Sequence, residues 1–311
     1  KFCFIIAPSL RGSLIDIPSD AQWEQNGITA AGYYGLGNGS RQFDTPLGLY
    51  VDDKQTIYVA DLNNHRIMEW KLGATNGKVV AGGNGPGNGA RQLNRPLDVI
   101  VDKESDSLII SDSENERVVR WSRRNGTHGE TIISNIHCIG LAMDENGALY
   151  VVDSENHQVK RYQRGKSQGM VVAGGNGRGD RLNQLSSPQF VFVDQDRSLY
   201  VSDIYNHRIM KWKEGAKHGI VVAGGQGQGN SLTQLYVPLG IFVDGLSTVY
   251  VADQGNNRIM RWPKEAKQGS VIVDGKQSNQ FNNPIDLSFD RYGNLYVNDQ
   301  ENHRVQRFSI K

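Results

Sequence analysis

The stretch from Pro46 to Trp70 reads Pro-Leu-Gly-Leu-Tyr-Val-Asp-Asp-Lys-Gln-Thr-Ile-Tyr-Val-Ala-Asp-Leu-Asn-Asn-His-Arg-Ile-Met-Glu-Trp. Its alternating pattern and its Val, Ile and Tyr content predict three short β-strands, at 47–51, 56–60 and 66–70. A fourth strand is predicted at 78–81, before a glycine-rich link. Four short antiparallel strands per unit are typical of one blade of a β-propeller.

Related units recur along nearly the whole chain. The aspartate that ends the second strand of each unit recurs six times, as Asp61, Asp112, Asp153, Asp203, Asp253 and Asp299. A unit of this size cannot bury its own apolar face, whereas six units arranged in a ring can. The sequence therefore predicts an all-β fold, a six-bladed β-propeller with four antiparallel strands per blade.

The two ends of the chain are expected to complete one blade together. The last unit stops after its third strand at Phe308, whereas residues 23–32 have the pattern of a lone fourth strand. Pairing this N-terminal strand with the last unit would close the ring and remove its open sheet edges. Residues 1–22 are then an N-terminal extension, and residues 23–311 form the propeller.

The composition argues against several functional classes. Lys and Arg number 34 against 33 Asp and Glu, which leaves a net charge of +1 and makes nucleic acid an unlikely partner. No apolar run approaches the roughly 20 residues that a membrane-spanning helix needs. Cys3 and Cys138 either form one disulfide or remain two thiols, and they lack metal-ligand spacing. No metal and no cofactor are predicted.

Two features favour an extracellular protein. The chain begins with Lys1, as a processed precursor does, although a truncated chain would begin in the same way. Asn38-Gly-Ser and Asn125-Gly-Thr match the N-glycosylation acceptor pattern. We therefore expect a secreted glycoprotein with Asn38 and Asn125 as the modified side chains.

The repeated residues carry a family resemblance. Tyr58-Val-Ala-Asp-Leu-Asn-Asn-His-Arg-Ile67, with the following Gly82-Gly-Asn-Gly-Pro-Gly87, resembles the NHL repeat. The resemblance extends over roughly residues 23–308 and implies a six-bladed propeller. It implies a binding or scaffold role by default, while some related propellers are enzymes or RNA-binding modules.

Residues that recur in every unit are predicted to be structural. Asn64 follows Asp61 by three positions and Arg66 follows it by five, and the other units repeat this spacing, with Gln158 in place of Arg in the third. Six equivalent copies cannot all face one substrate. The spacing therefore predicts a tight turn fixed by an Asp–Arg ion pair, and no catalytic residue.

Departures from the repeat are the better places to look for a site. Near the start of the innermost strand the first, third and fifth units have Gly, but the second, fourth and sixth have Asp98, Phe190 and Asp286. We expect these three side chains near the mouth of the central channel, where they either bind a polar ligand or cation or remain solvated.

A second departure is a basic segment around the irregular third unit. Its side chains are Arg120, Arg123, Arg124, Lys160 and Arg161. They form either a surface for an acidic partner or RNA, or an ordinary solvated edge. The third unit also lacks the glycine-rich link and has Cys138 where the other units have Pro.

The N-terminal extension contains an apolar stretch with Phe2, Phe4, Ile5 and Ile6. This tail either packs along its own propeller or is donated to a neighbouring molecule in self-assembly.

No set of nucleophile, base and orienting group is visible, so we predict a non-enzymatic binding scaffold for a protein, a glycan or another copy of itself. The alternatives are a propeller enzyme, a metal-assisted lyase or hydrolase with its site at the channel mouth, and an RNA-binding NHL module.

Overall fold

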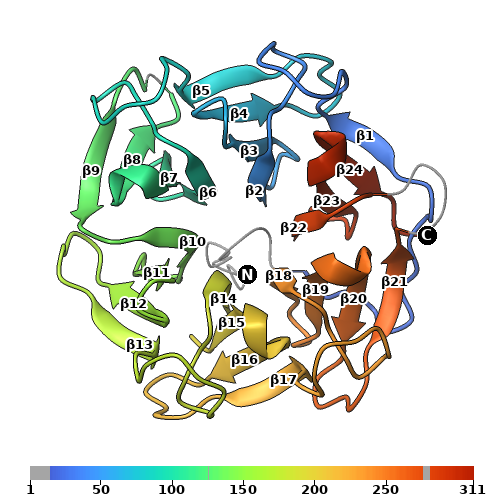
Figure 1. Cartoon of the computed structure of the whole chain (residues 1–311). Helices are drawn as coiled ribbons and strands as arrows, with labels where there is room; N and C mark the ends of the chain where they lie inside the picture. Colours follow the sequence, from blue (N-terminus) through green and yellow to red (C-terminus); the bar gives the residue numbers. More distant parts are fainter. Residues whose placement is uncertain (1–14, 125, 276–280) are drawn as a thin grey trace, which may run out of the picture.

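A computed structural model describes residues 15–124, 126–275 and 281–311. Its strands form six four-stranded antiparallel sheets arranged as blades around a central axis (Figure 1). In each blade the strand that begins with the repeated Pro, or with Cys138 in the third, lies nearest the axis. The structure therefore confirms the all-β, six-bladed propeller.

Five blades each use four consecutive strands, numbered from the axis outward. Blade A contains β2 (Pro46–Val51), β3 (Ile57–Asp61), β4 (Arg66–Trp70) and β5 (Lys78–Gly82). Blade B contains β6 (Pro96–Asp102), β7 (Ser107–Asp112), β8 (Arg117–Ser122) and β9 (Gly129–Ser134). Blade C contains β10 (Cys138–Met143), β11 (Leu149–Asp153), β12 (Gln158–Tyr162) and β13 (Met170–Gly174). Blade D contains β14 (Pro188–Val193), β15 (Leu199–Asp203), β16 (Arg208–Trp212) and β17 (Ile220–Gly224). Blade E contains β18 (Pro238–Val243), β19 (Val249–Asp253), β20 (Arg258–Trp262) and β21 (Ser270–Asp274).

Blade F joins the two ends of the chain. It contains β22 (Pro284–Phe289), β23 (Leu295–Asp299), β24 (Arg304–Phe308) and, outermost, β1 (Ile28–Ala31). In the antiparallel β1–β24 pair, Ile28 lies opposite Arg307, and a separate bridge joins Trp23 to Ile310. The predicted closure of the ring by the N-terminal strand is confirmed.

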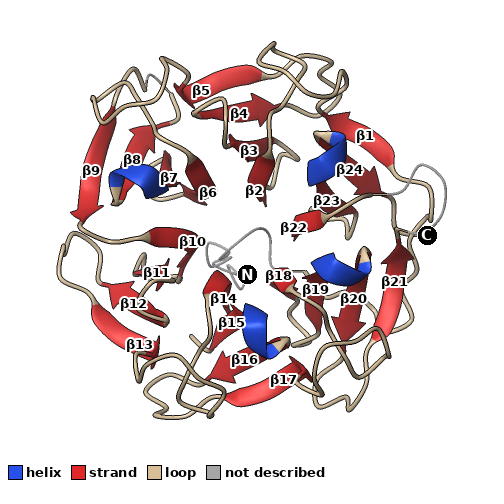
Figure 2. Ribbon diagram, in the orientation of Figure 1, coloured by secondary structure: helices blue, strands red, loops and turns tan. Residues whose placement is uncertain are grey.

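Strands dominate the described residues, and the helical segments are four single 3-10 turns (Figure 2). These turns are η1 (Ser113–Asn115), η2 (Ile204–Asn206), η3 (Gln254–Asn256) and η4 (Gln300–Asn302). Within the described ranges, none of the helices is long and apolar enough to cross a membrane.

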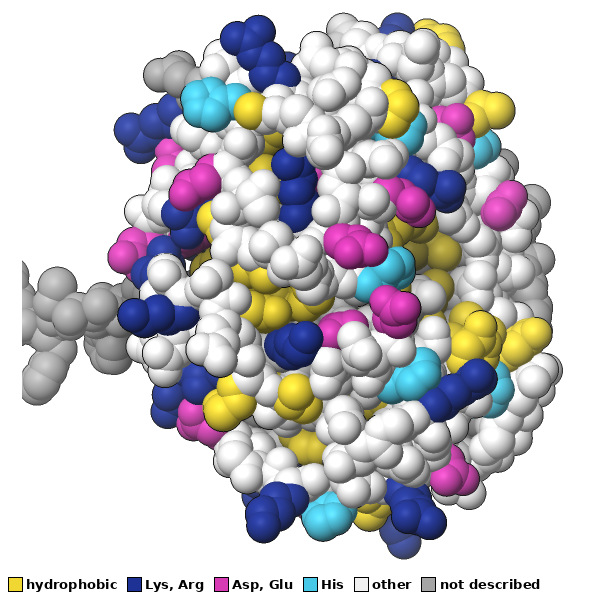
Figure 3. All heavy atoms as spheres, turned by 60° about the vertical axis from the view of Figure 1, so that its left-hand side comes forward, with side chains coloured by type: hydrophobic (Ala, Val, Ile, Leu, Met, Phe, Trp, Pro, Cys, Tyr) yellow, Lys and Arg dark blue, Asp and Glu magenta, His cyan; other side chains and the backbone are white. Residues whose placement is uncertain are grey.

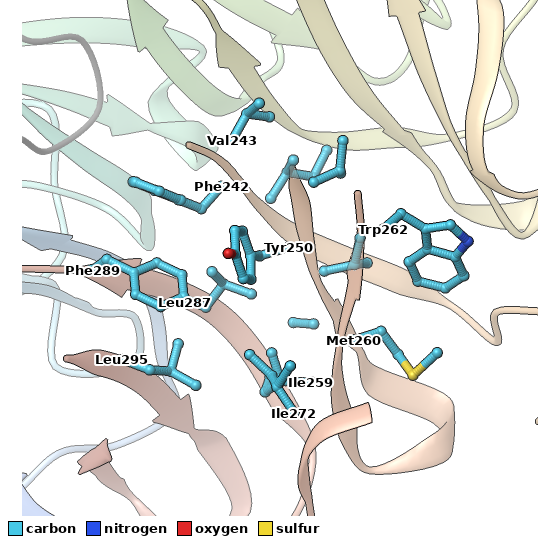
Figure 4. Packing of buried hydrophobic residues seen from close by; sticks show 14 of the residues in the cluster. Phe242, Val243, Tyr250, Ile259, Met260, Trp262, Ile272, Leu287, Phe289 and Leu295 are labelled. Carbon is cyan, nitrogen blue, oxygen red and sulfur yellow. The ribbon is translucent and has the colours of Figure 1, made fainter. Parts of the chain in front are cut away.

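The core lies between neighbouring blades. Tyr250 and Phe242 of blade E and Phe289 of blade F lie close together in Figure 4, and the Phe289 ring centroid is 4.8 Å from Tyr250 and 4.9 Å from Phe242. Burial of such large side chains stabilises each blade only through its neighbours. This explains why a single unit would not fold alone.

The described part of the N-terminal extension packs on its own propeller. Ile15 and Ile17 belong to the apolar core that blades D, E and F share, and the Ile15 carbonyl accepts the Gly245 amide at 2.8 Å. Phe2, Phe4, Ile5 and Ile6, on which the assembly hypothesis depends, lie outside the described residues.

Candidate functional site

The repeated Asp, Asn and Arg hold the glycine-rich links in place. Asp61 accepts a hydrogen bond from Arg66 Nε at 2.7 Å, and the Arg66 guanidinium also donates to the carbonyls of Asn38, Gly39 and Gln42 in the preceding link. Asp61 and Arg66 are both buried. The structural interpretation of this motif therefore has a concrete basis: one guanidinium satisfies a carboxylate and three main-chain carbonyls.

Blade C lacks both the link and the arginine. Gln158 donates to Asp153 at 2.8 Å, and Lys160 forms an ion pair with the same carboxylate at 3.0 Å. Since blade C is not preceded by a glycine-rich link, no link carbonyls require a guanidinium there. The missing link therefore explains why glutamine stands in place of arginine at position 158.

The channel-mouth aspartates are buried connections between blades. Asp98 is 1% exposed, and its two oxygens accept the amides of Val99 and of Leu141 in blade C, both at 2.8 Å. Asp286 is fully buried, and its two oxygens accept the amides of Leu287 and of Leu49 in blade A. The structure places the two carboxylates on separate seams and points each at backbone amides.

Glycines in alternate blades make room for these larger residues. A Cβ on Gly48 would lie 2.5 Å from Asp98 Oδ1, and one on Gly240 would lie 2.6 Å from the Asp286 Cα. Phe190, the third departure, lies in a buried apolar cluster with Ile204, Leu239 and Ile285. Sequence analysis identified the departures but missed their pairing with glycines of neighbouring blades.

The basic segment does not form an unmatched positive surface. Its side chains are ion-paired with carboxylates: Arg120 with Glu130, Arg123 with Asp52 and Asp106, Arg124 with Asp106, Lys160 with Asp153, and Arg161 with Asp144 and Glu214. Strand pairing brings these carboxylates from elsewhere in the sequence. The arrangement is typical of a structural network, and only Arg161 also lines a large cavity.

That cavity, the C–D groove, is the candidate functional site. It encloses about 720 Å³ between Tyr150, Arg161 and Met170 of blade C and Arg197, Trp212 and Glu214 of blade D. Figure 3 shows, on the side of the wheel that carries blades B and C, hollows with hydrophobic side chains at their floor and charged side chains at their rims. The combination of an apolar floor and polar rim suits a binding site.

The polar groups of the C–D groove are linked to one another. Glu214 bridges the two blades, with one oxygen 3.1 Å from Arg197 Nη2 and the other 3.5 Å from Arg161 Nη1. Arg161 also contacts Asp144 at 3.2 Å, and the Tyr150 hydroxyl donates to the same carboxylate at 3.2 Å. Burial, and then the nearby Asp144 charge, raises the pKa of Tyr150. Tyr150 is therefore a neutral donor at physiological pH.

The floor of the groove is open to solvent along β13. This strand pairs with β12 and is the outermost strand of its sheet, and its Met170 is 64% exposed and Val171 44% exposed. The corresponding cavity between blades B and C encloses only about 220 Å³, and Arg164 lines it while forming an ion pair with Asp102 at 2.9 Å. The C–D groove is thus the larger of these two inter-blade cavities by volume.

The other predicted sites are partly exposed, partly buried and partly outside the described residues. Asn38 is exposed, in agreement with a possible acceptor role, whereas Asn125 and Cys3 lie outside the described residues. Cys138 is a fully buried free thiol that donates to the Arg117 carbonyl at 3.2 Å. In the described part of the chain, no group of three or more His, Cys, Asp or Glu could hold a metal ion.

The fold and the repeated Asp–Asn–Arg anchor define a closed six-bladed propeller of tandem repeats. The NHL repeat model matches residues 43–68 and 136–162, and the chain is an NHL-repeat β-propeller. No curated protein matches its sequence.

Solved structures share the fold at low sequence identity. A protein of unknown function from Bacteroides thetaiotaomicron has 17% identity and a TM-score of 0.72, with 93% of this chain and 77% of that chain covered. An auxiliary nutrient binding protein from the same organism has 17% identity and a TM-score of 0.67, with the same coverage of 93% and 77%. A catalytically inactive virginiamycin B lyase from Staphylococcus aureus, with quinupristin, has 12% identity and a TM-score of 0.62, with 93% and 99% covered. At these identities the similarity establishes the fold alone.

Proposed function

We propose that this protein is a secreted, non-catalytic binding scaffold that holds a segment of a partner protein in the C–D groove. The observation that carries the proposal is the groove itself, a cavity of about 720 Å³ with an apolar floor and a bridged Arg161–Glu214–Arg197 rim. The auxiliary nutrient binding protein, which shares the fold, supports a binding role for this architecture.

A protein segment fits the groove better than a compact ligand does. The groove is bordered along its length by β13, an edge strand whose outer side pairs with no strand in the described chain. An extended peptide can add main-chain hydrogen bonds to such an edge while its side chains reach the apolar floor. The exposed Met170 and Val171 on this strand would be covered by the same contact.

A peptide-display selection tests this function. Randomised peptides are selected on the native protein and counter-selected on Ala216→Trp, a variant designed to fill the groove with an indole. We expect families of sequences that bind the native protein and lose binding to the variant. If the selected sequences bind both proteins equally, or if none is enriched, the groove is not a binding site for protein segments. Circular dichroism of Ala216→Trp confirms that the variant is folded.

A further inference from the structure

Blades C and E present the same surface to the blade that follows each of them. Tyr150 lies directly opposite Arg161 in the sheet of blade C, and Tyr250 lies opposite Arg261 in blade E. Each tyrosine hydroxyl also donates to the aspartate of the preceding turn, at 3.2 Å for Tyr150 and 3.1 Å for Tyr250. The two inter-blade spaces therefore begin from equivalent walls.

The space between blades E and F is filled by a segment of the chain itself. The Trp23 ring packs edge-on against Tyr250 with 6.2 Å between centroids, and the Arg261 guanidinium lies 5.9 Å from its centroid. The Trp23 indole N–H donates to the Gly293 carbonyl at 2.8 Å. Arg261 Nη1 donates to the Ala21 carbonyl at 3.0 Å, so the wall binds both the side chain and the backbone of the segment.

The C–D groove is the unfilled equivalent of that space. Arg197 follows Asp194 by three positions, as Gly293 follows Asp290, and both have a positive φ. The outer hairpin of blade D lines the groove with residues 213–218, among them the small Gly215 and Ala216, whereas blade F has the bulky segment around Trp23. Small residues in this hairpin leave the groove open.

An arginine donor in the groove also lacks an acceptor. Arg261 Nε donates to Ser270 Oγ at 3.2 Å, but Met170 takes the place of this serine in blade C. The Nε of Arg161 is buried and has no hydrogen-bond partner among the described residues. An orphaned donor at this position is costly unless a ligand satisfies it.

The charges indicate what kind of segment fits. Residues 15–25, which occupy the E–F space, carry Asp16, Asp20 and Glu24 and contain no Lys or Arg. The lining of the C–D groove has one carboxylate, Glu214, against four cationic side chains: Arg161, Arg197, Lys213 and Lys217. Charge complementarity therefore favours an acidic occupant.

From these relationships we infer that the C–D groove takes an extended, acidic segment of a partner protein, anchored by an aromatic side chain over Tyr150 and Arg161. The inference rests on the proposed function and specifies the chemistry of its ligand. The aromatic ring would contribute apolar burial and a cation–π contact with arginine, as Trp23 does in the E–F space.

The test uses the chain's own segment as a probe. A synthetic peptide with the sequence of residues 15–25 is titrated into the full protein labelled with ¹³C-methyl methionine and ¹⁵N-indole tryptophan. Met170 reports on the C–D groove, Met143 lines the B–C cavity, and the Trp23 indole reports whether the peptide displaces the native segment. We expect a saturable shift of the Met170 methyl signal with the Trp23 signal unchanged.

Matched variants identify the contacts. Replacing tryptophan by alanine in the peptide should weaken binding about tenfold, as loss of an aromatic anchor does. Replacing its three carboxylates by amides, or Arg197 by Glu in the protein, should weaken binding and reduce its salt dependence. Lys264→Glu, in the exposed hairpin of blade E, is the control and should leave binding unchanged.

Three results would overturn the inference. The first is an unchanged Met170 methyl signal, and the second is a shift of the Trp23 indole signal alone. The third is equal affinity of the protein for the original peptide and for the peptide in which alanine replaces tryptophan. If display selection still yields groove-dependent peptides without acidic and aromatic residues, the proposed function stands and this ligand chemistry is wrong. If selection also yields nothing, the proposed function fails as well.

Discussion

Asp286 Oδ2 accepts the backbone amide of Leu49 at 2.9 Å and thereby connects the inner strand of the last blade to that of the first. Asp98 makes the equivalent contact with Leu141 between blades B and C. Both carboxyl groups are buried, so each contact satisfies a carboxyl oxygen and an amide that water cannot reach. The ring is thus held at these seams by polar contacts as well as by apolar packing.

Asp286→Ala should destabilise the propeller. Loss of the carboxylate leaves the Leu49 and Leu287 amides buried without this acceptor, which costs about 1–3 kcal/mol for an unsatisfied group. Urea denaturation followed by circular dichroism measures the change. Asp196→Ala, at an exposed turn, is the control and should change the free energy of unfolding by less than about 0.5 kcal/mol. Equal effects of the two substitutions would contradict the proposed role of Asp286.

The arginine of the repeat should matter only where a glycine-rich link precedes the blade. Arg208 bonds to Asp203 at 2.7 Å and to the carbonyls of Asp180, Arg181 and Gln184 in the link. Arg208→Gln breaks a buried ion pair and should cost about 3 kcal/mol.

The chain offers a natural comparison at Gln158, where the link is missing. Gln158→Arg should give no gain in the free energy of unfolding, because the added guanidinium finds no link carbonyls and lies near Lys160. A clear stabilisation by Gln158→Arg would show that arginine contributes through the aspartate alone.

How far the sequence predicts this molecule depends on whether a property repeats. The strands and the closure were predictable because burial recurs at fixed positions; all five residues of β3 are buried, as are those of β23. Ring closure followed from counting strands at the two ends. Such patterns depend on local spacing, which a single sequence displays directly.

Properties that join different blades were harder to predict. Arg123 belongs to a basic run in the sequence, but the fold pairs it with Asp52, 71 positions earlier. The C–D groove is lined by Gly215 and Ala216 of blade D together with Met170 of blade C. No motif marks this site, and the only signal in the sequence is that its walls resemble those around Trp23.

Cys138 should be unreactive in the native protein. Its thiol is fully buried, and burial raises its pKa to about 12, so very little reactive thiolate forms at neutral pH. Iodoacetamide labelling at pH 8 followed by peptide mapping should modify Cys138 only after denaturation. Rapid labelling in the folded state would show that blade C opens locally.

Two histidines should make the propeller less stable in mild acid. The Nδ1 atoms of His65 and His207 accept the backbone amides of Arg95 and Val237, which lie at the start of the next blade, at 3.1 and 3.4 Å. A protonated imidazole has no free lone pair on Nδ1, so each bond requires the neutral ring. Partial burial lowers the pKa of His65, with a further contribution from Arg95 and an opposing one from Asp112. Burial also lowers the pKa of His207, and the negative charges of Asp253 and Asp203 oppose this shift.

The sign of the pH effect follows from these lowered pKa values. Above the ordinary histidine pKa of 6.5 the rings are neutral in both states and stability is independent of their titration. As the pH falls below 6.5 the unfolded chain binds protons first, so the free energy of unfolding decreases until the folded-state pKa is passed.

Blade E supplies the control, because Asn257 Oδ1 accepts the Asn283 amide at 2.8 Å in the same position. The double variant His65→Asn, His207→Asn should retain these bonds and lose less stability between pH 7.5 and 5 than the native protein in urea denaturation. Identical pH dependence of the two proteins would show that the histidines do not control these contacts.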